Sequence, residues 1–186
     1  MNVIKIFIIM FLATSAYADC RSHKDFIYAL KNQMVSTVGR KSQMLQSIIR
    51  NNLDLKKISR FIIGKHWVLS QDATREDFLR EYEAYFVRLC TKILYDYIQS
   101  SEMSVMGTKK VDDRVCIINT RFSHSDNEEF TNIDFQVTKK DNSFLISDIT
   151  VSGISVLINQ RAQFNKRIDT YGIEQVIKEL KCNNNL

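Results

Sequence analysis

Residues 103–152 restrict the fold more than any other part of the chain, because four apolar segments follow one another there with only short polar gaps between them. The segments are Met103–Lys109, Arg114–Phe122, Phe130–Lys139 and Ser143–Val151. In the third, Ile133, Phe135 and Val137 alternate with polar residues. Short polar gaps suit hairpins, whereas parallel strands need long crossover connections. The pattern predicts a four-stranded antiparallel sheet in meander order, covered on one face.

Helical patterns precede and follow this block. Apolar residues recur at three- and four-residue steps from Ser22 to about Leu69, with Asp54 as a candidate cap for one helix. The longest helix is predicted over 75–98, capped by Thr74. After Gly153, one helix is expected from Ser155 to Gly172 and a last one over Ile173–Lys181. Helices packed on one side of an antiparallel sheet make an α+β domain.

The first residues have the pattern of a cleaved signal peptide. Lys5 precedes the apolar run Ile6–Ala13, and Ala16-Tyr17-Ala18 supplies the small residues that signal peptidase requires. The run is shorter than the ~20 residues of a membrane-spanning helix, and Asp19 argues against a lipoprotein site at Cys20. We therefore expect a signal peptide over 1–18, export to the periplasm and a single domain over 19–186.

Charge and cysteine spacing limit the possible partners and sites. Loss of Lys5 with the signal peptide lowers the formal charge from +5 to +4, and the basic residues are spread along the chain, which argues against nucleic-acid binding. The four cysteines do not have the spacing of a zinc site. Cys20 and Cys182 lie near the two ends and are candidates for a disulfide. Cys90 and Cys116 fit equally well as bridged cysteines or as small buried side chains.

The sequence contains no recognisable catalytic motif. His23, His66 and His124 are not spaced as metal ligands, and no G-x-S-x-G, glycine-rich phosphate loop or H-E-x-x-H occurs. We predict no catalytic residue, no metal site and no cofactor. The chain is instead rich in aromatic and β-branched residues, which fit either a solid core or the lining of a ligand cavity.

Two long stretches resemble the MlaC family of periplasmic phospholipid-binding proteins, also called the toluene-tolerance family. The first, Phe61–Tyr97, contains a glycine, an aromatic-Trp pair at His66-Trp67, a polar turn and a helix rich in Phe and Leu. The second, Phe144–Leu180, contains a strand with Asp148, a Gly-Ile-Ser turn, an Arg-x-x-Phe helix and a Gly-Ile close. Both stretches occur in the family's order.

The resemblance implies an NTF2-like cone, in which N- and C-terminal helices wrap a twisted four-stranded antiparallel sheet around an apolar pocket. It also implies a non-enzymatic carrier that holds the acyl chains of a phospholipid as cargo. Such a carrier exchanges lipid with an outer-membrane lipoprotein–porin complex and with an inner-membrane ABC transporter that has a substrate-binding subunit, and so maintains outer-membrane lipid asymmetry. A structural adaptor with a solid core and a small hydrolase of the same fold are the alternatives.

The expected lipid pocket is lined by apolar side chains from the sheet and from the helices on both sides of it in the sequence. These residues are Phe61, Trp67, Phe86, Ile93, Ile133, Phe135, Val137, Leu145, Ile149, Leu157 and Phe164.

Overall fold

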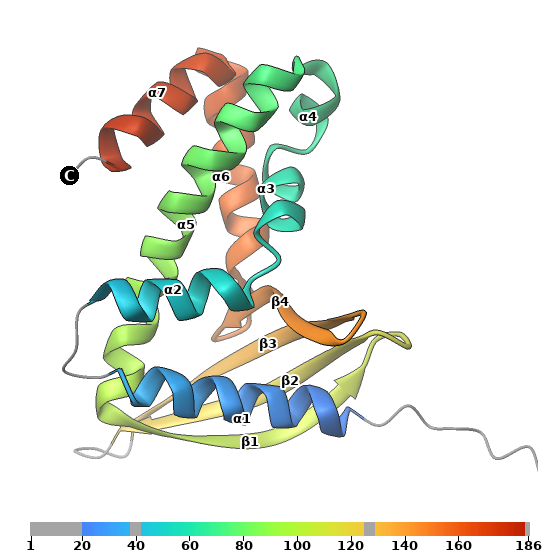
Figure 1. The fold of residues 1–186 in the computed structure, drawn as a ribbon, viewed down its shortest axis with the longest axis vertical. Coiled ribbons are helices and arrows are strands. Elements are labelled where there is room, and N and C mark those ends of the chain that lie inside the picture. The colour runs from blue at the N-terminus through green and yellow to red at the C-terminus, as the bar shows by residue number, and fades with distance from the viewer. Residues whose placement is uncertain (1–19, 38–41, 125–128, 185–186) are drawn as a thin grey trace, which may run out of the picture.

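The computed structural model describes residues 20–37, 42–124 and 129–184, and in these ranges seven helices pack with one antiparallel sheet (Figure 1). The predicted signal peptide lies outside the described residues. The helices are α1 (Arg21–Val35), α2 (Ser42–Asn52), α3 (Leu55–Ile63), α4 (Lys65–Leu69), α5 (Asp72–Ser100), α6 (Val156–Tyr171) and α7 (Ile173–Asn184). The strands are β1 (Ser101–Lys110), β2 (Val115–His124), β3 (Phe130–Lys140), β4 (Ser143–Val151) and β5 (Ile154–Ser155).

The sheet confirms the predicted α+β class and the meander order. Its strands follow the order β1-β2-β3-β4-β5, all antiparallel, and the sheet does not close on itself. Phe135 lies opposite Ile118 on one neighbouring strand and Ile149 on the other, and all three side chains are buried. The sheet has five strands where four were predicted, because β5 contains two residues and is too short to show an alternating pattern.

The cap predicted at Asp54 and the helix start predicted at Ser155 are both confirmed. The Asp54 carboxylate accepts a hydrogen bond from the backbone N–H of Lys57 at 3.4 Å, and Gly64 ends α3 with a positive φ of 48°. The Ser155 hydroxyl accepts from the backbone N–H of Ile158 at 3.1 Å. Asp148 of β4 supports this cap, since its carboxylate accepts the Ser155 hydroxyl at 2.7 Å. The strand, the turn and the helix that follow one another here are therefore held together by one acidic side chain.

The predicted start of α5 at Thr74 is wrong, because the helix already begins at Asp72. The backbone N–H of Arg75 donates to the carbonyl of Gln71 at 3.0 Å and closes a helical turn before Thr74. The Arg75 guanidinium also donates to the Trp67 carbonyl at 2.7 Å, which ties this turn to α4. Contacts with the preceding helix therefore extend α5 beyond the cap that the sequence suggests.

The cysteine pairing differs from the bridge considered between Cys20 and Cys182, which is wrong. Cys20 bonds to Cys116 of β2, whereas Cys90 is a buried free thiol and Cys182 an exposed one. Figure 1 shows the start of α1 and the end of α7 at opposite ends of the molecule. Cys20 and Cys182 are thus not joined, and the disulfide instead attaches α1 to the sheet.

None of the helices within the described ranges is long and apolar enough to span a membrane.

Candidate functional site

The helix-facing side of the sheet borders a narrow apolar space between the sheet, α1 and the C-terminal half of α5. α1 contributes the face that carries Ile27, Leu30 and Met34, which point toward the sheet because they are spaced three and four residues apart. One recess of this space is lined by Ile27, Leu30, Lys31, Met34, Leu94, Met103, Phe122, Phe135 and Ile146.

A second recess lies on the other side of Leu94, between α5, the inner face of β3 and β4, and the start of α6. Its lining consists of Cys90, Ile93, Leu94, Ile133, Ile149, Val151 and Val156. Leu94 lines both recesses, and Ile133 and Phe135 are successive inward-facing residues of β3. We call the two recesses together the apolar slot.

The apolar slot is narrow in this structure. The recess next to Phe135 has a cavity volume of about 20 Å³ and the recess next to Ile149 about 10 Å³, each close to the space that one water molecule needs. A ligand with long hydrocarbon chains therefore fits only if α1 or α5 moves away from the sheet.

The chemistry of the slot is that of an apolar binding site. Lys31 of α1 is the charged residue in its lining, and it is partly exposed, so its ammonium marks the side that faces water. The Cys90 thiol is buried, and burial raises its pKa to about 12. A thiol with this pKa stays protonated at neutral pH and behaves as a small apolar group rather than a nucleophile.

The N-terminal end of α1 is held at three points. Besides the Cys20–Cys116 disulfide, the Nε2 atom of His23 lies 3.1 Å from the carbonyl oxygen of Arg114. The His23 ring also packs edge-on against Phe144 of β4, with ring centroids 4.8 Å apart. The N-terminal turns of α1 are thus attached to β2 and β4.

The structure brings four of the predicted pocket residues to the slot. Ile93, Ile133, Phe135 and Ile149 line it, and Val137 is fully buried on the same face of β3. Leu145 pairs with Thr138, whose side chain points to the opposite face from Val137. Strand alternation brings Ile133, Phe135, Val137 and Ile149 to one face of the sheet, and Ile93 reaches the slot from α5. The bulge between Gln136 and Val137 shifts the register before Leu145.

The other predicted pocket residues lie in the helical part of the protein. Phe86 and Phe164 belong to a buried aromatic cluster with Tyr82, in which the ring of Phe164 stands edge-on to that of Tyr82 at 5.1 Å. Trp67 of α4 lies under the guanidinium groups of Arg60 and Arg75, at 5.0 and 5.5 Å.

Phe61 and Leu157 line a different groove on the outside of α3. The residue types alone do not show that these apolar side chains lie in an aromatic cluster, beside Arg60 and Arg75, and in a groove, rather than in one pocket.

Sequence reasoning did not assign the α1 residues Ile27, Leu30 and Met34 to the site, nor the sheet residues Met103 and Phe122. The helical spacing of the α1 residues was visible and identified a buried face. Only the placement of α1 across the sheet shows that this face borders the slot (Figure 1).

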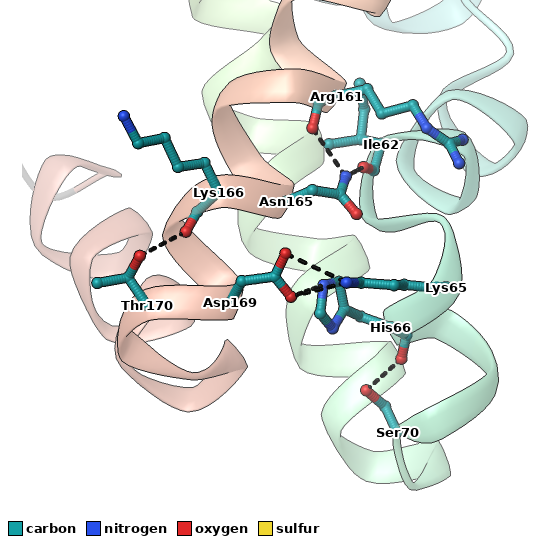
Figure 2. A network of polar contacts seen from close by, with 9 residues as sticks. All are labelled: Ile62, Lys65, His66, Ser70, Arg161, Asn165, Lys166, Asp169 and Thr170. Carbon is teal, nitrogen blue, oxygen red and sulfur yellow. Dashed lines mark hydrogen bonds and ion pairs between the residues drawn. The ribbon is translucent and has the colours of Figure 1, made fainter.

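Apart from the apolar slot, a group of polar side chains joins α4 to α6 (Figure 2). Asp169 of α6 contacts the ammonium of Lys65 at 2.9 Å and the Nε2 atom of His66 at 3.3 Å. The hydrogen bond from Lys65 lowers the pKa of the Asp169 carboxyl. The Ser70 hydroxyl donates to the backbone carbonyl of His66 at 2.7 Å and is not bonded to the imidazole. The contacts of His66 are therefore those of a residue that joins two helices.

This polar region also borders a wider recess of about 440 Å³, lined by His66, Leu69, Ser70, Gln71, Thr74, Ile168, Gly172, Ile173 and Glu174. Across the described ranges, no group of three or more His, Cys, Asp or Glu side chains is placed to hold a metal ion.

Comparison with known proteins agrees with this architecture. The family model described as MlaC protein matches residues 21–182. Among solved structures, the chain is similar to the phospholipid-binding protein from Ralstonia solanacearum, which was solved in complex with a phospholipid. The TM-score is 0.72 at 16% sequence identity, over 86% of this chain and 95% of the other. No curated protein matches the sequence.

Proposed function

The chain belongs to the MlaC family, and on this premise we propose that it binds a phospholipid in the apolar slot and carries it between membranes. The observation that supports the proposal most directly is the slot itself, because two apolar recesses meet at Leu94 between the sheet and the helices that cover it. Family membership points to a binding or transport protein rather than an enzyme.

The energetics suit this role. Each methylene group transferred from water into an apolar site contributes about 0.8 kcal/mol, so acyl chains bind tightly without any polar contact. When α1 moves away from the sheet, it loses apolar contacts with the sheet, and contacts with the bound acyl chains replace them. The phosphate group remains in water near Lys31, whose ammonium is the charge next to the slot.

The surroundings and partners of this carrier are part of the proposal. It works in the periplasm after cleavage of residues 1–18. It exchanges phospholipid with an outer-membrane lipoprotein–porin complex and with the substrate-binding subunit of an inner-membrane ABC transporter. This exchange would maintain outer-membrane lipid asymmetry. Lipid is the cargo of the protein and not a cofactor.

The test places a charge inside the slot. Phe135→Asp puts a carboxylate where acyl chains would lie, whereas Asn132→Asp puts one on the exposed face of the same strand. Natively purified protein is extracted with organic solvent and the extract is analysed by mass spectrometry. We expect about one phospholipid per wild-type and Asn132→Asp molecule, and at least about a tenfold loss in Phe135→Asp. A Phe135→Asp protein that keeps its lipid contradicts the proposed slot.

A second variant separates lipid binding from folding. Leu94→Trp adds apolar volume where the two recesses meet, so it should exclude lipid without burying a charge. Circular dichroism checks the fold of each variant. Lipid-free wild-type protein that fails to take up labelled phospholipid would instead favour a structural adaptor with a solid core, and appearance of hydrolysed lipid would favour the hydrolase.

A further inference from the structure

The exposed side of α3 and the hairpin between β3 and β4 bring lysines together outside the apolar slot. The residues Asp54, Lys56, Lys57, Arg60 and Lys140 line a recess of about 250 Å³, which we call the cationic recess. The first turn of α3 lies beside the sheet because the backbone N–H of Asp54 donates to the carbonyl of Ile146 in β4 at 3.0 Å. Four cations and one acid therefore share one concave surface.

The four cations of this recess outnumber its one acidic residue, Asp54. Among the described residues, neither the lysines nor Arg60 forms an ion pair, whereas cations elsewhere on the helices do, such as Arg80 with Asp77. Asp54 uses its carboxylate to cap α3. Since all three lysine side chains are exposed, the recess presents positive charge to solvent.

An amphipathic groove of about 230 Å³ continues from the cationic recess, and Lys57 lines both. Its apolar wall includes Phe61 and Ile158, which are 39% and 64% exposed. The Arg161 guanidinium lies 4.6 Å from the Phe61 ring centroid and donates to the Phe61 carbonyl at 2.6 Å. This contact fixes the Phe61 ring as part of a preformed wall.

The polar groups on the floor of the groove are already bonded to one another. The Gln136 amide donates to the Ser147 hydroxyl at 3.0 Å, and the Asp148 carboxylate accepts the Ser155 hydroxyl. The groove therefore offers a partner mainly apolar contacts, next to a recess in which four cations face one acidic residue.

We infer that the cationic recess and the adjoining groove form a docking surface for an acidic segment of a partner protein that carries an apolar side chain. Carboxylates of the segment would neutralise the lysines, and its apolar side chain would pack against Phe61 and Ile158. Both parts of the surface are concave, so a protein segment fits them, whereas a flat bilayer would reach only their rims. None of the lining residues belongs to the apolar slot, so docking is separate from lipid binding.

The test compares two charge reversals of equal size. Lys56→Glu/Lys57→Glu/Lys140→Glu alters the cationic recess, and Lys109→Glu/Lys166→Glu/Lys178→Glu alters exposed lysines elsewhere. The probe is a fluorescein-labelled peptide of three Glu-Glu-Leu-Leu repeats, and binding is followed by fluorescence anisotropy at low and physiological salt. We expect binding to weaken by about tenfold or more in the first variant and to change by less than about twofold in the control.

Two further measurements separate the possible outcomes. A peptide in which Ser replaces Leu should bind the wild-type protein several-fold more weakly, because it lacks the apolar contact. Flotation with phosphatidylglycerol vesicles tests the membrane alternative. Equal weakening in both reversal variants, or vesicle binding that depends on the cationic recess while peptide binding does not, would overturn the inference. Circular dichroism and the phospholipid content of each variant distinguish loss of docking from loss of folding or of the lipid slot.

Discussion

Tyr82 lies inside the helical part of the protein, with its ring stacked between those of Phe78 and Phe86 at centroid distances of 5.4 and 5.7 Å. The side chain is fully buried. Its hydroxyl is among the buried polar atoms that have no hydrogen-bond partner within the described residues. Burial raises the pKa of this hydroxyl well above its usual value, so it remains neutral. The ring stabilises the core, whereas the hydroxyl opposes folding.

Tyr82→Phe should therefore increase the free energy of unfolding, by about 1 kcal/mol, because it removes a buried unbonded hydroxyl and keeps the ring. Urea denaturation followed by circular dichroism measures the change. Tyr85→Phe is the matched control, since Tyr85 is partly exposed, and it should change stability by less than about 0.5 kcal/mol. A clear loss of stability in Tyr82→Phe would show that the hydroxyl is hydrogen-bonded.

At the scale of single elements, α1 forms one wall of the apolar slot, and a disulfide attaches its N-terminal end to the sheet. The Cys20–Cys116 disulfide joins residues 96 positions apart in the sequence. It fixes the first turn of α1 on β2, while Met34 and Lys31 at the other end border the slot. If the proposed function holds, we expect lipid to enter at the end of α1 away from the disulfide.

Cys20→Ser/Cys116→Ser should lower the free energy of unfolding by about 2–4 kcal/mol and the melting temperature by roughly 5–15 °C. It should also speed the release of labelled phospholipid several-fold, because α1 loses its attachment. Cys182→Ser is the control and should change neither property, since Cys182 is an exposed free thiol.

A thiol assay checks the pairing that underlies this prediction. Unreduced wild-type protein should show two free thiols after unfolding, from Cys90 and Cys182, and only Cys182 should react in the folded protein. Alkylation of Cys20 without reduction would contradict the pairing.

At the scale of the whole molecule, α5 connects two regions of different packing. Figure 1 shows its N-terminal part among α3, α6 and α7, and its C-terminal part next to the sheet, α1 and α2. The aromatic cluster lies in the first region and the apolar slot in the second. The slot can therefore widen by movement of α1 without disrupting the aromatic core.

Loading of lipid-depleted protein with phospholipid at about 100 times its dissociation constant should stabilise the fold by about 2.7 kcal/mol, or about 5–10 °C in melting temperature. Amide hydrogen exchange should slow in α1 and in the C-terminal half of α5, because the acyl chains fill the slot between these helices and the sheet. Exchange in α7 should not change. Protection confined to α6 and α7 would place the lipid elsewhere.

Much of the fold could be predicted because its signals are local. Alternation in β3 identified the inward face of Ile133, Phe135 and Val137, and all three are buried. Asp54 and Ser155 cap helices through hydrogen bonds within three residues of themselves. The sheet side of the candidate site followed in part from the same alternation, since Ile133, Phe135 and Ile149 line the slot.

The amino-acid sequence by itself determined the α+β class, the meander of β1 to β4, the cap of α3 and the start of α6, because side-chain periodicity and capping depend on neighbours along the chain. The tertiary structure alone decided the pairing of Cys20 with Cys116, the meeting of two recesses at Leu94 and the approach of Lys140 to Lys56 and Lys57. Each of these joins residues from separate elements. Their proximity depends on how the helices lie on the sheet, and no local pattern contains that information.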